Sequence, residues 1–292
     1  MSRLTVWASR NLPLLYALLI LYLAIVVYLP GRVRYKHNVM PYWYRIHGII
    51  SLVLLVLLTP DFLISMVARG WSRTVCDRAS YYSAPLSGWA VNLFFVSKLL
   101  DFGETVLIVF DDRRPLPIHI FHHFCTFHFF WTSIAGEVAL LRPLILSNLG
   151  AHVLLFAYLT PLKFCGIHPC YLSVAFSQLV QFVVGFLACT QAYWVIYSGA
   201  ECHVSRSWLA VTTAGIIAFL FLFADFYHQK YLKFRQERAG LQEQKEREKV
   251  ELREVQELRS FERVNVSRSR SPLTLSSCGS LTLYRSASRH DS

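Results

Sequence analysis

Long apolar stretches recur along the chain and restrict its possible folds more than any other feature. The hydrocarbon core of a bilayer is about 30 Å thick, and an α-helix crosses it with about 20 mainly apolar residues. Of the 292 residues, 54% are hydrophobic, above the roughly 45 to 50% of a soluble domain. The seven candidate stretches are Leu12 to Leu29, Ile46 to Met66, Trp89 to Phe110, Ile118 to Ile134, Val138 to Thr160, Leu172 to Ile196 and Trp208 to Phe226. We therefore expect an all-α, polytopic membrane protein with seven transmembrane helices.

The last apolar stretch marks the end of the predicted membrane domain, which we place at residues 1–228. Residues 229–292 are a charged tail with fourteen Lys or Arg against nine Asp or Glu. Up to about Arg263 its composition favours a solvated helix or a weak coiled coil. The Ser/Arg-rich remainder is too poor in core-forming residues to fold by itself. No recognition motif accompanies the net charge of +11, so we expect no nucleic-acid partner.

The connectors between the stretches differ in positive charge, which predicts the orientation in the membrane. With a lumenal amino terminus, the cytosolic connectors and the start of the tail hold eleven Lys or Arg, and the lumenal side holds seven, Arg142 among them. Because cytosolic loops carry an excess of Lys and Arg, we expect a cytosolic carboxyl terminus. On this topology Cys76 and Cys202 are both lumenal, in an oxidising space, and we expect them to form a disulfide.

The third stretch carries charged residues at bilayer depth. In "SKLLDFGET", Lys98, Asp101 and Glu104 lie at steps of three, on one face of a helix. Ionisable residues in a membrane span are costly unless paired, and each is a candidate functional residue. The alternative is a buried ion pair that only fixes helix packing.

The fourth stretch contains a histidine cluster. In "PIHIFHHFCTFHFF", His119, His122 and His123 stand at i, i+3 and i+4 and converge on one side of a helix, whereas His128 lies outside this group. Three close imidazoles are typical of metal ligands or of acid–base and nucleophilic groups, and the alternative is three ordinary core histidines.

Two further stretches carry polar pairs that could face the same interior. Asn148 and His152 are four residues apart in the fifth stretch, and Gln178 and Gln181 are three apart in the sixth. Either pair alone fits an ordinary interhelical hydrogen bond.

The four sets occur in a fixed order on successive stretches, and in this the sequence resembles the very-long-chain fatty acid elongases of the endoplasmic reticulum. That family has the patterns K-x-x-E-x-x-D-T, H-x-x-H-H, N-x-x-x-H-x-x-M-Y and T-x-x-Q-x-x-Q. Here they read "KLLDFGET", "HIFHH", "NLGAHVLLF" and "AFSQLVQ", within a similarity that covers roughly residues 30 to 235. The chain departs from the pattern with Asp101 in place of Glu, Glu104 in place of Asp, Leu155-Phe156 in place of Met-Tyr, and Ala175 in place of Thr.

The resemblance implies a condensing enzyme that joins a long-chain acyl-CoA to malonyl-CoA, with loss of CoA and carbon dioxide, inside an acyl tunnel enclosed by the seven helices. The middle histidine of the family's box corresponds to His122, which would carry the acyl group. His152, oriented by Asn148, would polarise a thioester carbonyl. His119 and His123 would hold the geometry or move protons. The other polar residues expected to line the chamber are Lys98, Asp101, Glu104, Gln178 and Gln181.

The resemblance also implies the surroundings of the reaction. Arg113, Arg114 and Lys163 lie at the predicted cytosolic mouth, where the phosphates of CoA would bind. We expect no metal and no cofactor besides the two substrates, and a location in the endoplasmic reticulum membrane. Other enzymes of the elongation cycle and a second copy of the chain are the protein partners considered.

Two other classes of function compete with this interpretation. A membrane di-iron desaturase or hydroxylase also uses H-x-x-H-H, but needs around eight histidines in about three boxes, and this chain has one box. A transporter or channel would line its path with polar residues, but would not need the four ordered motifs.

Overall fold

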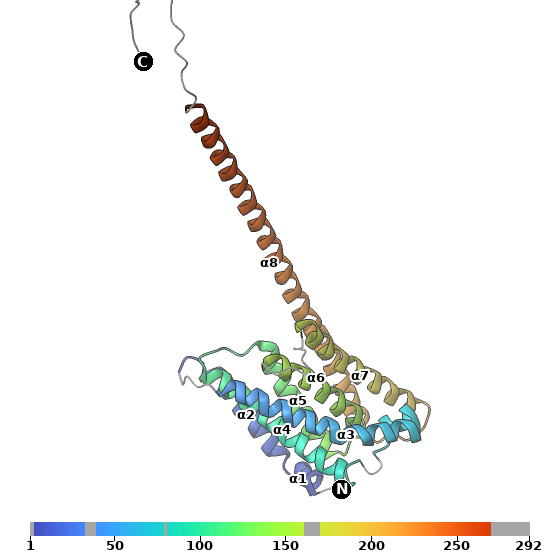
Figure 1. Cartoon of the computed structure of the whole chain (residues 1–292). Coiled ribbons are helices and arrows are strands. Elements are labelled where there is room, and N and C mark those ends of the chain that lie inside the picture. The colour runs from blue at the N-terminus through green and yellow to red at the C-terminus, as the bar shows by residue number, and fades with distance from the viewer. Residues whose placement is uncertain (1–2, 33–38, 79–80, 161–169, 270–292) are drawn as a thin grey trace, which may run out of the picture. The chain divides into compact units, whose positions relative to one another are not determined.

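The computed structural model describes residues 3–32, 39–78, 81–160 and 170–269, and these residues form helices without a β-strand. The all-α class is thus confirmed for the part of the chain that is described. The chain divides into two compact units after Lys230. The helices are α1 (Arg3–Arg10), α2 (Leu12–Tyr28), α3 (Met40–Cys76), α4 (Pro85–Phe110), α5 (Pro117–Ala135), α6 (Leu141–Leu159), α7 (Tyr171–Tyr197) and α8 (Arg206–Ser269) (Figure 1).

Every predicted apolar stretch lies on one of the helices α2 to α8. Several of these helices begin with a proline in the first turn, where the missing N–H would have had no helical partner. Among the described residues, four helices are long and apolar enough to cross a membrane, or five if the bent pair α1–α2 counts as one span. Helix α4 carries three charged residues and α5 four histidines, which lower their hydropathy. Seven spans therefore remain a prediction.

Helix α1 is an addition that the hydropathy pattern did not predict. It meets α2 at an angle of 69° and packs against α5. The indole Nε1 of Trp131 donates to the carbonyl of Ala8 at 3.0 Å, and the hydroxyl of Thr5 donates to Glu137 at 3.1 Å. These contacts fix the first turns of the chain against the far end of α5.

The apolar core of the first unit consists of two clusters. One joins α2, α3, α4, α5 and α6 around large aromatic side chains such as Phe94, Phe127 and Trp131. The other joins the end of α3 to α6, α7 and α8, with Phe182 and Leu209 among its members. Many large apolar side chains outside these clusters are exposed, as expected where lipid covers the surface.

Helix α3 contains a sharp break at Gly70. This residue has φ 75° and ψ 171°, a conformation open essentially to glycine alone. The hydroxyl of Thr74 donates to the carbonyl of Gly70 at 2.8 Å and lies 2.9 Å from that of Ser65. The break turns the last residues of α3 towards the segment that precedes α8.

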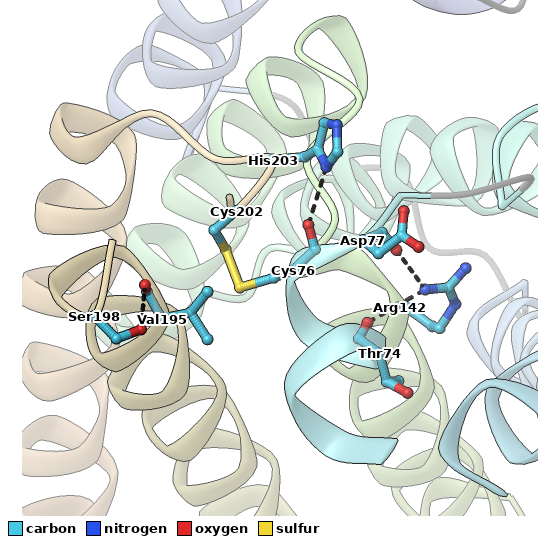
Figure 2. The surroundings of a disulfide bond; sticks show 8 residues. All are labelled: Thr74, Cys76, Asp77, Arg142, Val195, Ser198, Cys202 and His203. Carbon is cyan, nitrogen blue, oxygen red and sulfur yellow. Dashed lines mark hydrogen bonds between the residues drawn. A yellow bond between two sulfur atoms is a disulfide. The ribbon is translucent and has the colours of Figure 1, made fainter. Parts of the chain in front are cut away.

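Cys76, at the end of α3, forms a disulfide with Cys202 in the segment between α7 and α8 (Figure 2). Nδ1 of His203 lies 3.2 Å from the carbonyl oxygen of Cys76, and the backbone N–H of His203 donates to the same oxygen at 2.9 Å. The two segments are thus joined by a covalent bond and by hydrogen bonds beside it.

Arg142 lies beside the disulfide, and its position corrects the count of cations on the predicted lumenal side. We counted it among the lumenal connector cations, but its side chain is buried and its Nε donates to Asp61 at 2.7 Å. Its NH1 donates to the carbonyls of Thr74 and Asp77 (Figure 2), and its guanidinium lies 4.7 Å from the ring centre of Tyr81. Because Arg142 is internal, the lumenal side keeps six connector cations against eleven, which favours the same orientation.

The segment between α3 and α4 packs on the same end of the bundle. Arg78 donates to the buried Glu137 at 2.8 Å. Burial raises the pKa of Tyr82 well above its usual value, so its hydroxyl stays neutral and donates to the carbonyl of Val138 at 2.8 Å.

The second unit contains the part of α8 from Tyr231 onwards. Its side chains from residues 231 to 257 are exposed. Arg247 pairs with Glu243 and Lys249 with Glu246, each at 2.7 Å along the helix. Each such pair stabilises a helix in water by about 0.2 to 0.5 kcal/mol.

A peptide map made without reduction should recover Cys76 and Cys202 in one cross-linked pair of peptides, because both sulfurs belong to the same disulfide. Cys125, Cys170 and Cys189 should be alkylated as free thiols in the same sample. Recovery of Cys76 and Cys202 as alkylated thiols would contradict the disulfide.

Candidate active site

The charged residues of α4 lie inside the bundle, on the face predicted from their spacing. Lys98, Asp101, Glu104 and Thr105 are all buried, with at most 8% of each exposed. The ammonium of Lys98 donates to Oδ2 of Asp101 at 3.0 Å and lies 4.9 Å from the ring centre of Phe94. The cation is thus neutralised by a neighbour on its own helix and covered by an aromatic face.

The two acidic residues of α4 have different surroundings. Oδ1 of Asp101 lies 3.4 Å from Nδ1 of His47, so each oxygen of this carboxylate has a polar partner. Within the described chain, Glu104 accepts no hydrogen bond, although it lies within electrostatic range of Asp101 and Lys98. We had treated the two acids alike, and the structure separates them.

The histidine cluster of α5 is divided between two sides of the helix. The hydroxyl oxygen of Thr105 lies 3.1 Å from Nε2 of His119 and 3.3 Å from Nδ1 of His123. The hydroxyl of Tyr22, on α2, lies 3.3 Å from the same oxygen. Two of the three histidines therefore face α4 and α2 and share one hydroxyl group.

His122 faces the other way and lines a cavity of about 240 Å³ between α5, α6, α7 and the first part of α8. The rings of Phe219 and Phe223 stand edge-on to its imidazole, with centres 5.4 and 6.1 Å away. The walls are mostly apolar, and amide groups of Asn148 and Gln181 interrupt them. An imidazole beside an apolar cavity can react with a substrate whose alkyl chain is kept from water.

The amide groups beside this cavity form a chain of hydrogen bonds. Asn148 donates from Nδ2 to Oε1 of Gln181 at 3.2 Å, and Gln181 donates from Nε2 to Oε1 of Gln178 at 2.7 Å. Oδ1 of Asn148 is buried and has no partner within the part of the chain that is described. We expected Asn148 to orient His152, but its amide hydrogen bonds to the neighbouring helix instead.

His152 is buried on α6, where its ring stands edge-on to Phe156 with centres 5.5 Å apart. The same face of α6 approaches α3, since the ring of His47 also stands edge-on to Phe156 at 5.5 Å. The ring centres of His122 and His123 are 5.7 Å apart and His123 contacts Thr105, so the cavity wall adjoins the polar cluster on α4.

Two of the three candidate CoA-binding residues lie within the described part of the chain. Arg113 is exposed and pairs with Asp111 at 2.9 Å, and Arg114 is exposed. Lys163 lies outside the described residues. Phosphate binding at this end of the molecule stays a prediction.

Sequence reasoning missed several residues of the site. His47 stands at the start of the second apolar stretch, in "YWYRIHG", and the rule that flagged the α4 residues would have flagged it too. Tyr22 gave no sequence signal beyond a phenol in an apolar stretch. His128, which lies outside the predicted group of three histidines, lines the same cavity as His122.

Replacing Thr105 by Val should destabilise the bundle, because the ring nitrogens of His119 and His123 and the hydroxyl of Tyr22 lose a common partner. A buried polar group left unsatisfied costs about 1–3 kcal/mol, so the midpoint of thermal unfolding in detergent should fall by several degrees. Thr190→Val is the matched control, since the Thr190 hydroxyl is exposed and bonds only within its own helix. Equal midpoints for both variants would contradict the shared role of Thr105.

Comparisons with known proteins find relatives named fatty acid elongases. A putative fatty acid elongase 3 of Caenorhabditis elegans is 28% identical over 193 residues, which cover 65% of this chain and 60% of that protein. Fatty acid elongase 2 of Trypanosoma brucei brucei is 23% identical over 78% of this chain and 91% of its own length. Very long chain fatty acid elongase 6 of Rattus norvegicus is 23% identical over 57% and 63%. The chain thus spans less than two thirds of the first and third of these relatives.

A family profile gives a longer match. Residues 7–239 match the ELO family, described as the GNS1/SUR4 family, over a range that contains α4 to α7 and the disulfide. The chain is a multi-pass membrane protein that belongs to the ELO family.

Proposed function

We propose that the protein is the condensing enzyme of fatty acid elongation. It would join a long-chain acyl-CoA to malonyl-CoA and release carbon dioxide, CoA and a 3-oxoacyl-CoA two carbons longer. The observation that carries the proposal is the position of His122, which faces an apolar cavity while its neighbours His119 and His123 face the hydroxyl of Thr105. Family membership and the names of the relatives support the same activity.

The first half of the reaction transfers the acyl group to His122. A neutral ring nitrogen attacks the thioester carbon, the carbon–sulfur bond breaks, and the proton of the imidazole ends on the sulfur of CoA. The apolar wall beside His122 would hold the alkyl chain and exclude water, which would otherwise hydrolyse the acyl-imidazole.

The second half consumes malonyl-CoA. Loss of carbon dioxide leaves an enolate whose carbon attacks the acyl carbon, the carbon–nitrogen bond breaks, and His122 takes up one proton from water. His152 would polarise a thioester carbonyl from α6, the helix whose Asn148 lines the cavity beside His122. His119 and His123 would fix α5 through Thr105.

Several features of the surroundings belong to the same proposal. Seven spans would enclose the acyl tunnel, with a lumenal amino terminus and a cytosolic tail, in the endoplasmic reticulum membrane. The Cys76–Cys202 disulfide fits an oxidising lumenal side. Arg113, Arg114 and Lys163 would bind CoA phosphates, with no metal or cofactor besides the substrates, and other enzymes of the cycle or a second copy would be the partners.

The desaturase and transporter hypotheses predict a different site or a different reaction outcome. A di-iron site needs many histidines around the metals, whereas in the described residues no group of three or more His, Cys, Asp or Glu could hold a metal ion. Iron analysis of the purified protein gives an independent test, because stoichiometric di-iron would contradict the condensing enzyme. A transporter would carry no label from malonyl-CoA into a longer acyl chain.

Purified protein in lipid, given acyl-CoA primers of several lengths and malonyl-CoA labelled at C2, should form labelled 3-oxoacyl-CoA. His122→Ala should lower the rate by roughly a thousandfold or more, as loss of a nucleophile does. With acyl-CoA alone, intact-mass analysis should find one acyl adduct on the native protein and none on the variant.

His228→Ala is the control, because His228 is an exposed histidine of α8 outside the site. Absence of labelled product with every primer would contradict the proposed activity. Full activity of His122→Ala would instead contradict the role of His122.

A further inference from the structure

His47 belongs to α3, a helix that contributes none of the four sequence motifs, yet its side chain reaches the centre of the α4 cluster. Only 3% of the residue is exposed, and its Nδ1 lies 3.4 Å from Oδ1 of Asp101. The ammonium of Lys98 donates to the other oxygen of Asp101, Oδ2, at 3.0 Å. The carboxylate is therefore held by one partner from its own helix and one from α3.

The ring of His47 is held by contacts on other helices as well as its own. The indole of Trp43 stacks on it with ring centres 4.9 Å apart, and Phe156 of α6 stands edge-on at 5.5 Å. The ring of Trp43 in turn fits against Gly103 of α4, where a Cβ atom would lie only 2.9 Å from its Cη2. The glycine in "LDFGET" thus leaves room for the side chain that supports His47.

Nδ1 is the ring nitrogen of His47 that faces the carboxylate of Asp101. Because a carboxylate only accepts hydrogen bonds, this contact favours the ring form with a proton on Nδ1. Nε2 is buried and has no hydrogen-bond partner within the described residues, so no second contact competes with the carboxylate for the ring.

We infer that His47 is a positioning residue of the condensing reaction, which it serves by fixing the carboxylate of Asp101 beside Lys98. The inference rests on the proposed function. Asp101 is one methylene shorter than the Glu of the family pattern and has less reach, and a second partner from α3 fixes where its negative charge lies. A rotated carboxylate would change the field at His152, because the rings of His47 and His152 both stand edge-on to Phe156, each with centres 5.5 Å apart.

Two substitutions separate the polar contact of His47 with Asp101 from the packing of its ring. His47→Asn places an amide N–H close to the position of Nδ1, whereas His47→Phe keeps a ring between Trp43 and Phe156 but removes the donor. His47→Phe should lower kcat about 10- to 100-fold, as loss of a hydrogen bond to a charged group does. His47→Asn should stay within about threefold of the native kcat, and neither should change KM for either CoA substrate by more than about twofold.

A third substitution, Gly103→Ala, tests whether the packing of Trp43 holds the ring of His47, and it leaves His47 itself unchanged. Gly103→Ala should push Trp43 away and lower kcat about tenfold, because the stacked ring of His47 moves with it. Gly150→Ala is the matched control, since a Cβ atom there would meet nothing within 4 Å. Formation of the Cys76–Cys202 disulfide and a monodisperse elution profile in detergent establish that each variant is folded.

The outcomes distinguish this inference from the proposed function. Elongation by the native protein tests the proposed function itself. Given that activity, native kcat in His47→Phe, or a loss in His47→Asn as large as in His47→Phe, would overturn the positioning role. If His47→Phe does not fold, an unchanged rate in Gly103→Ala would overturn it instead.

Discussion

The ion pair between Lys98 and Asp101 is the constraint on which the interior of this membrane protein depends. A charge inside a bilayer-sized bundle is stable only when it is paired and its remaining hydrogen-bonding capacity is used. Lys98 donates to one oxygen of Asp101, and the other oxygen contacts His47 on α3. The pair therefore connects two helices, and the aromatic side chains around it keep it from lipid and water. The histidine helix α5 packs against the same face of α4 through Thr105.

Much of the architecture follows from hydropathy, and much of the site does not. All seven apolar stretches lie in helices, since the run of apolar residues sets where a membrane helix forms. The apolar run of α1 is too short to be recognised as a membrane span from hydropathy. Its position depends on contacts with Trp131 and Glu137. Periodicity placed Lys98 and Asp101 on one face of α4. It could not show that His47 completes the contact, because the pairing depends on which helices are neighbours.

The amide groups illustrate the same limit on a smaller scale. The family resemblance implied that Asn148 orients His152, but Asn148 donates to Gln181 of α7, which is the interhelical hydrogen bond that the spacing alone allowed. Similarly, the i, i+3, i+4 spacing of the α5 histidines suggested a single cluster. The neighbouring helices divide it, with two members directed towards Thr105 and His122 towards the cavity. Sequence spacing determines which residues share a face of one helix. Tertiary packing determines which neighbouring helix that face contacts.

The disulfide has a consequence for the order of biosynthesis. Cys76 and Cys202 are 126 residues apart, and every residue of the four motifs lies in the loop that they close. Because the amino-terminal part of the chain is made first, α3 to α7 are all synthesised before the second cysteine. The disulfide therefore forms only after every helix that carries a motif has been made. Once it has formed, a single cut in any connector from α4 to α7 would leave the two fragments covalently linked.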